Sequence, residues 1–180
     1  MACDYRPLSS RLAIDANVLS LLVVYHHCEC TNVSAQRRKH ILVETRGRDD
    51  GLPTERFNDL WQLFRNARHR TVTQHVIAET LSPLRGWLKV HSEAVREGGI
   101  SLVRTFDLEE LPCRIRDLAA DEAYRKVLIE LGPTDAGLLW MAKSVKATLI
   151  SDDGDLLPWA HNLNVPAYSV REIPALAQSQ

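Results

Sequence analysis

The chain has 180 residues, of which 45% are apolar and 25% are charged, and this ordinary globular composition excludes a wholly disordered protein. Its 22 Lys and Arg and 23 Asp and Glu give a formal net charge of −1, so overall charge indicates neither nucleic-acid binding nor an acidic tail. A chain of this length buries roughly 70% of its unfolded surface and needs no disulfide or structural metal to fold. We expect one domain over residues 1–180, with a core from about residue 11 to residue 171.

The first third of the chain predicts a strand, two helices and a polar insertion. Leu12–Ile14 is an apolar run that predicts a buried strand, and Val18–Tyr25 predicts a buried helix. Residues 28–53 are polar and predict an exposed or mobile insertion. Pro53 is expected to begin a helix. One apolar stripe of that helix holds Phe57, Leu60, Trp61 and Phe64.

The middle of the chain alternates between short apolar runs and longer helical patterns. Thr71–Thr73 predicts a strand that leads into a helix from about Val76 to Arg96. The pair Gly98-Gly99 is expected to end that helix, and Ile100–Thr105 then predicts a third strand. A further helix is expected from Leu108 to Leu131.

The last third continues this alternation. Pro133 is expected to open a helix, and Ala147–Ile150 predicts a strand. A short helix through Trp159 and His161 and a final strand over Val165–Val170 follow. Alternating strands and helices predict an α/β fold around a mainly parallel sheet.

Acidic residues recur at equivalent places in this pattern. Asp15 directly follows the first strand, and Ser151-Asp152-Asp153-Gly154-Asp155 follows the Ala147–Ile150 strand. Asp135 lies in the first turn of a helix that precedes a strand, and Glu79 lies in a helix that follows one. Ligands of parallel sheets bind outside the carboxyl ends of the strands, so these acids are expected on one rim. Crowded carboxylates repel one another, and a hard cation such as Mg²⁺ is the usual partner of such oxygen ligands.

Each acid has a simpler explanation when it is taken alone. Asp15 could cap the following helix, Asp135 could complement a helix dipole, and Glu79 could be a solvated surface residue. The acids around Asp153 could form a turn with a helix cap. An EF-hand is excluded because the D-x-D-x-D-G order is missing. The combination favours a metal site more strongly than any single member does.

This ordered set of segments resembles the PIN-domain family of metal-dependent nucleases, in particular the toxin-type ribonucleases of prokaryotic toxin–antitoxin pairs. The resemblance extends from about Leu12 to Val170, and its first and last segments are the specific ones. The matching segments are Leu12–Leu19, Val76–Leu81, Thr134–Leu138 and Thr148–Leu156. The residues from His26 to Pro53 exceed what a compact toxin usually carries between its first two helices.

The resemblance implies a three-layer α/β/α sandwich and a set of metal ligands. The implied core acids are Asp15, Glu79, Asp135 and Asp153, which would bind Mg²⁺ or Mn²⁺, with Asp155 as a further ligand. Asn17 and Ser151 match polar positions that flank the site, and Asp152 matches a variable position. The implied activity is hydrolysis of RNA to a 5′-phosphate and a 3′-hydroxyl. The implied partners are an RNA substrate, an antitoxin protein and a second copy of the chain.

Other functions stay open at this point. A catalytically silent module of the same fold could bind RNA or protein. A phosphatase of the haloacid dehalogenase type needs an Asp two residues after its Asp nucleophile, whereas Asn17 stands in that place. The cluster from His26 to Cys30 contains zinc-ligand residue types, but its spacing matches no familiar zinc pattern. Basic clusters at Arg37–Lys39 and at residues 65, 68 and 70 could contact phosphates.

The remaining expectations concern location and assembly. The chain starts without a basic and apolar secretory signal, and its longest apolar run is far below the ~20 residues of a membrane span. The four irregularly spaced Cys indicate reduced thiols. We therefore expect a cytoplasmic protein without a membrane segment. Apolar residues around Trp61, Phe64 and Trp87 suggest a homodimer interface.

Overall fold

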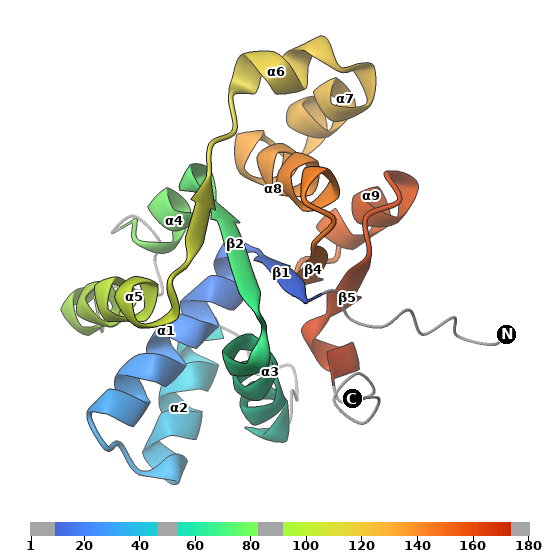
Figure 1. Ribbon diagram of the computed structural model, residues 1–180. Coiled ribbons are helices and arrows are strands. Elements are labelled where there is room, and N and C mark those ends of the chain that lie inside the picture. Colours follow the sequence, from blue (N-terminus) through green and yellow to red (C-terminus); the bar gives the residue numbers. More distant parts are fainter. Residues whose placement is uncertain (1–9, 47–53, 83–91, 174–180) are drawn as a thin grey trace, which may run out of the picture.

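A computed structural model describes residues 10–46, 54–82 and 92–173 of the chain, and its centre is a parallel sheet (Figure 1). The five strands are paired in the order β3-β2-β1-β4-β5, and every neighbouring pair is parallel. Their bounds are β1 (Arg11–Ile14), β2 (His69–Thr73), β3 (Glu109–Leu111), β4 (Thr148–Ser151) and β5 (Ala167–Ser169). The predicted parallel α/β fold is confirmed.

Helices cover both faces of this sheet and make the three-layer α/β/α sandwich (Figure 1). One face carries α1 (Ala16–Cys30), α2 (Ala35–Arg46), α3 (Thr54–Asn66), α4 (Gln74–Thr80) and α5 (Ser92–Phe106). The other carries α6 (Ile115–Ala120), α7 (Glu122–Glu130), α8 (Pro133–Ser144) and α9 (Leu156–Asn162). A 3₁₀ turn, η2 (Val170–Glu172), follows β5. Right-handed crossovers between parallel strands account for this division. The chain moves in one direction across the sheet from β1 to β2 and β3, and in the opposite direction from β3 to β4 and β5, so the two sets of connecting helices lie on opposite faces.

The first helix, α1, is the centre of its layer. It contacts α2, α3, α4 and α5, and most of its side chains are buried. A helix surrounded in this way is apolar on nearly every side, so its sequence shows no helical stripe. In the opposite layer α8 packs across β1, β2 and β4, which gives the buried strands β1 and β4 cover on both faces.

The chain changes direction between β1 and β4. These strands are neighbours with Ile14 opposite Ile150, yet β1 leads through α1 toward β2 and β4 leads through α9 toward β5. Connections that leave neighbouring strands in opposite directions open a crevice at the carboxyl ends, where ligands of α/β proteins bind. Asp15 and Ser151 lie at this point of the fold.

The predicted strand over Ile100–Thr105 is wrong, because these residues belong to α5. The pair Gly98-Gly99 does not end a helix but brings α5 close to its neighbours. A Cβ at Gly98 would lie 3.0 Å from Cβ of His27, and one at Gly99 would lie 2.6 Å from Cδ2 of Leu81. The third strand is instead Glu109–Leu111.

Two predicted long helices are also interrupted. The helix expected over Leu108–Leu131 is replaced by β3, α6 and α7. Asp121 begins α7, since its carboxylate accepts hydrogen bonds from the N–H groups of Ala123 at 2.9 Å and Tyr124 at 3.3 Å. The helix expected over Val76–Arg96 is divided into α4 and α5, and residues 83–91 lie outside the described part.

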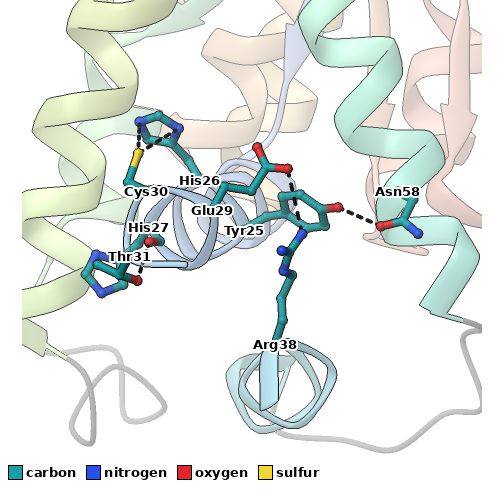
Figure 2. Close-up of polar contacts among 8 residues, drawn as sticks. All are labelled: Tyr25, His26, His27, Glu29, Cys30, Thr31, Arg38 and Asn58. Carbon is teal, nitrogen blue, oxygen red and sulfur yellow. Dashed lines mark hydrogen bonds and ion pairs between the residues drawn. The ribbon is translucent and has the colours of Figure 1, made fainter. Parts of the chain in front are cut away.

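The polar segment 28–53 is mostly a helix rather than a loop over its described residues. Residues 35–46 form α2, most side chains from 29 to 41 are at least partly exposed as expected, and residues 47–53 lie outside the description. Arg38 docks α2 on α1 (Figure 2): its Nη1 lies 3.7 Å from Oε1 of Glu29, and its guanidinium lies 4.7 Å from the ring centre of Tyr25. Tyr25 in turn donates to Oδ1 of Asn58 on α3 at 2.6 Å. The polar residues therefore join helices.

The aromatic residues expected at a dimer interface lie inside the core. Trp61 and Phe64 are 2% and 1% exposed, and their rings stack with centroids 5.7 Å apart. Both residues belong to the predicted stripe of α3, which is buried as expected. Their burial removes the apolar argument for a dimer at this place, while Trp87 lies outside the described residues.

Arg70 on β2 joins the carboxyl-terminal ends of α3 and α5. Its guanidinium donates to the carbonyls of Phe64 at 2.6 Å, Arg65 at 2.5 Å and Phe106 at 3.3 Å. The same group lies over the rings of Phe64 and Phe106, 5.2 and 5.3 Å from their centres. One cation thus satisfies three carbonyls that the two helices and the turns after them leave without intrahelical partners.

Replacement of Arg70 by Met should therefore destabilise the protein by about 2–3 kcal/mol, because charge-assisted hydrogen bonds are lost and three carbonyls lose their donor. Urea unfolding of the variant measures this loss. Arg68→Met, at an exposed position two residues away, should change stability by less than about 0.5 kcal/mol. Equal stability of the two variants would contradict the role of Arg70.

Candidate active site at the carboxyl ends of β1 and β4

The centre of the candidate site is Asp15, which follows β1 and caps α1. The residue is 3% exposed. Its Oδ1 accepts a hydrogen bond from the N–H of Val18 at 2.6 Å. Its Oδ2 accepts from the hydroxyl of Ser151 and from the N–H of Asp152 at 3.2 Å. The carboxylate is therefore held by groups from the first turn of α1 and from the end of β4.

Ser151 connects Asp15 to the acids that follow β4. Its side chain is fully buried, donates to Asp15 and accepts from the N–H of Asp153 at 2.9 Å. Oδ1 of Asp153 accepts from the N–H groups of Asp155 at 2.8 Å and Leu156 at 3.4 Å, which shapes the turn into α9. Asp153 is partly exposed and Asp155 is exposed. Hydrogen bonds thus link Asp15 to Ser151 and Ser151 to the backbone of Asp153, while a metal site shared by the two carboxylates stays a prediction.

Burial dominates the electrostatics of Asp15. It raises the pKa of this carboxyl from 3.8 to about 6, although hydrogen bonds from Ser151, Val18 and Asp152 act in the opposite direction. Within the described residues Asp15 forms no ion pair with Lys or Arg. A carboxylate offers about four lone-pair sites, and three hydrogen bonds leave one of these on Oδ1. The residue therefore fits the ligand chemistry of a hard divalent cation, whose charge would stabilise the buried anion.

Glu79 and Asp135 come from the same edge of the sheet. Glu79 lies near the end of α4, which follows β2, and the hydroxyl of the next residue, Thr80, donates to the carbonyl of Ala16 at 3.4 Å. Asp135 lies in the first turn of α8. Two residues later, Gly137 packs closely against Cys113: a Cβ added at Gly137 would lie 3.2 Å from Sγ of Cys113. Because Cys113 follows the end of β3, the start of α8 is placed at the carboxyl side. Both acids, with Asn17 exposed in the first turn of α1, therefore lie on the expected rim.

The acids do not form a preassembled cage. Over residues 10–46, 54–82 and 92–173, no group of three or more His, Cys, Asp or Glu side chains is arranged to hold a metal ion. Carboxylates without a bound cation repel one another. The shared binding of one or two cations by Asp15, Glu79, Asp135 and Asp153 stays a prediction.

The His26–Cys30 cluster gains no support as a zinc site from the described residues. His26 is buried and its Nε2 lies 3.0 Å from the hydroxyl of Ser101. Sγ of Cys30 lies 3.8 Å from Nδ1 and 3.7 Å from Nε2 of the same ring (Figure 2). Cys28 is fully buried, about 200° around the helix from Cys30. Among the described residues, the pair of His26 and Cys30 therefore has no third or fourth ligand of the kind that structural zinc requires.

No family model matches this sequence, and no curated protein matches it. The resemblance to metal-dependent nucleases thus depends on four short acidic segments and their order. In the part of the chain that the structure describes, no helix combines the length and the apolarity of a membrane span.

Sequence reasoning missed the groups that support the acids. Thr73 caps α4 by accepting from the N–H of Val76 at 3.3 Å, and its signal is a hydroxyl residue just before an apolar helical pattern. Thr80 and the backbone N–H of Asp152 were also missed. A backbone donor has no sequence signal, because any residue supplies one.

The raised pKa of Asp15 predicts how stability depends on pH without metal. The folded state binds more protons than the unfolded state between about pH 4 and 6, so this residue makes stability fall as pH rises through that window. The contribution of Asp15 to the free energy of unfolding changes by at most about 3 kcal/mol across this window. Thermal melts in chelator at pH 4.5 and pH 7 should show this dependence in the wild type and a smaller one in Asp15→Asn. The same pH dependence in both proteins would show that Asp15 is not the group responsible.

Proposed function

We propose that the chain is a metal-dependent endoribonuclease that hydrolyses RNA with Mg²⁺ or Mn²⁺ and leaves a 5′-phosphate and a 3′-hydroxyl. The observation that carries the proposal is Asp15: a buried carboxylate at the switch point of a parallel sheet, without a cationic partner among the described residues. Such a group is costly to bury unless a cation binds it.

Some residues of the chain would bind the cation, and others would hold those ligands in position. Asp15 would bind the cation through the remaining lone pair of Oδ1, with Glu79, Asp135 and Asp153 completing the oxygen ligands and Asp155 assisting. Ser151 keeps the Asp15 carboxylate in place by donating to Oδ2. The chemistry that a bound Mg²⁺ supplies is charge neutralisation on the scissile phosphate and a more acidic water.

The proposed setting is the cytoplasm, where RNA substrates are available. The resemblance further suggests a homodimer and an antitoxin partner, and so a toxin role. A catalytically silent RNA- or protein-binding module is the alternative, and the lack of a preassembled group of three ligands among the described residues is the observation in its favour.

Cleavage of a labelled single-stranded RNA by the purified chain distinguishes these functions. The proposal expects cleavage with Mg²⁺ or Mn²⁺, none in chelator, and products carrying 5′-phosphates. Binding without cleavage at any metal concentration would support the silent module. Cleavage that persists in chelator would remove the metal mechanism.

The two adjacent acids after β4 should respond differently to substitution. Asp152 contributes its backbone N–H to Asp15, which Asp152→Asn retains, so this variant should keep its cleavage rate within about threefold. Asp153→Asn removes a ligand charge and should lower the rate by about 100-fold or more, because several kcal/mol of charge stabilisation are lost. Single-turnover rates in Mg²⁺ measure both effects. The reverse ranking would assign the ligand to Asp152.

A further inference from the structure

Within the described part of the chain, the amino edge of the sheet, opposite the candidate site, carries more cations than acids. We call this surface the amino-edge cationic face, and its exposed members are Arg65, Arg68, Arg104, Lys143 and Lys146. None of these side chains forms an ion pair within the described part of the chain. Two described acids lie at the same edge: Asp107 directly follows α5, and Glu109 begins β3 and pairs with Arg11 at 3.6 Å.

Backbone pairing places two of these cations near each other. Arg68 precedes β2, and its N–H donates to the carbonyl of Ser10 at 3.1 Å. Lys146 lies in the turn before β4, two residues ahead of Thr148, which pairs with Leu12 of β1. Arg68 and Lys146 therefore lie at the starting ends of β2 and β4, the two strands on either side of β1.

Helix ends bring the other three cations to the same edge. Arg70 binds the carbonyls of both Arg65 and Phe106, so the last turns of α3 and α5, with Arg65 and Arg104, lie together. Lys143 lies in the last turn of α8, and its carbonyl accepts from the N–H of Lys146 at 3.2 Å. The five cations thus form a band across the starting ends of β2, β1 and β4.

Helix dipoles explain only part of this band. Cations in the last turn of a helix are favourable, which accounts for the three on α3, α5 and α8. Lys146 follows the end of α8 with φ of 55°, in the left-handed region. The residues that follow α1, α5 and α9 in the same conformation are Asn32, Asp107 and Asn164, types that tolerate it. The left-handed backbone at position 146 therefore favours Asn over Lys, and the presence of Lys there needs another explanation.

We propose that the amino-edge cationic face binds the phosphate backbone of single-stranded RNA. This inference rests on the proposed function. The acidic edge repels phosphates, so affinity for RNA has to come from cations elsewhere on the surface. Strands of three to five residues separate the two edges by only roughly 10–17 Å, a distance that a short RNA spans. Of the exposed large apolar side chains of the described residues, Ile115 and Ile129 belong to α6 and α7, and Ile100 lies one helical turn before Arg104 on α5. A face with five cations and one neighbouring apolar side chain fits a polyanion better than a protein partner.

The test measures binding of a fluorescent single-stranded RNA of about 15 nucleotides to the full chain in chelator, over a series of salt concentrations. The double variant Arg68→Gln/Lys146→Asn should bind about tenfold more weakly, and the slope of log K against log salt should fall by about 1.4. Lys146→Asn alone should melt at the same or a higher temperature, which separates lost binding from lost folding.

The matched control is Arg37→Gln on α2, which removes a cation that is also exposed but lies outside the band. It should change the affinity less than about twofold. An unchanged salt slope in the double variant, an equal loss in Arg37→Gln, or no RNA binding by the wild type would each overturn the proposal. So would equally tight binding of a polyglutamate peptide, which would assign the face to an acidic protein.

Because chelator prevents metal-dependent cleavage, the two proposals can fail separately. RNA binding that depends on Arg68 and Lys146 without any cleavage in Mg²⁺ supports the cationic face and removes the enzyme. Cleavage in Mg²⁺ together with unchanged binding by the double variant supports the enzyme and removes the face.

Discussion

Asp15→Asn should lower metal-dependent RNA cleavage by several orders of magnitude while the chain still folds. The substitution keeps the size of the side chain but removes the charge that would bind the cation, and the loss of metal charge stabilisation costs several kcal/mol of barrier. Single-turnover cleavage with saturating Mg²⁺ and Mn²⁺ measures the effect. A rate within tenfold of the wild type would remove Asp15 from the catalytic site.

The fold should survive Asp15→Asn because two opposing effects nearly cancel. The carboxylate accepts from the N–H groups of both Val18 and Asp152, and an amide with one oxygen loses one of these bonds at a cost of about 1.5–3 kcal/mol. Removing the buried charge stabilises the folded state by about 3 kcal/mol at neutral pH. The matched control is Asp121→Asn, which alters an exposed helix cap on α7 and should leave cleavage unchanged.

Trp61→Ala should destabilise the protein by about 3–5 kcal/mol, the range for truncation of a buried Trp. The indole is 2% exposed, and its ring centre lies 5.2 Å from that of Tyr25 and 5.3 Å from that of Phe106. It therefore fills the space where α3, α1 and α5 meet. Chemical unfolding in urea measures the loss.

Two further variants sharpen the expectation for Trp61. Nε1 of the indole is buried without a hydrogen-bond partner in the described residues, so Trp61→Phe removes that unpaired donor and should cost less than Trp61→Ala. Ile129→Ala, at a position that is 77% exposed, should change stability by less than about 0.5 kcal/mol. A loss below 1 kcal/mol for Trp61→Ala would show that the aromatic cluster does not hold these helices together.

The fold class could be predicted because its signals are local. β1 and β4 are short apolar runs followed by acids, and α8 begins at Pro133. The strand over Ile100–Thr105 was mispredicted because β-branched and apolar residues in a short run favour a strand as much as a buried helix. The deciding contact lies elsewhere in the chain, where Gly98 and Gly99 pack against α1 and Leu81.

In the candidate site too, local sequence patterns predicted some features, whereas others depend on contacts between distant parts of the chain. The sequence predicted acids at the carboxyl ends of two parallel strands, and the family resemblance implied Ser151 beside them. Asp15 and Ser151 are hydrogen-bonded across 136 positions of separation. Strand order could not be read from the sequence, so the switch point between β1 and β4 came from the structure. Of the cationic face only Arg65 and Arg68 were recognised in the sequence, because the position of the other members at the edge opposite the acids depends on where helices end.

A divalent cation bound at Asp15 is the central claim, and Mn²⁺ binding measured by titration calorimetry tests it most directly. The wild-type chain should bind one or two Mn²⁺ ions, and Asp15→Asn should lose that binding while Asp121→Asn retains it. No binding by the wild type, or equal binding by Asp15→Asn, would contradict the claim.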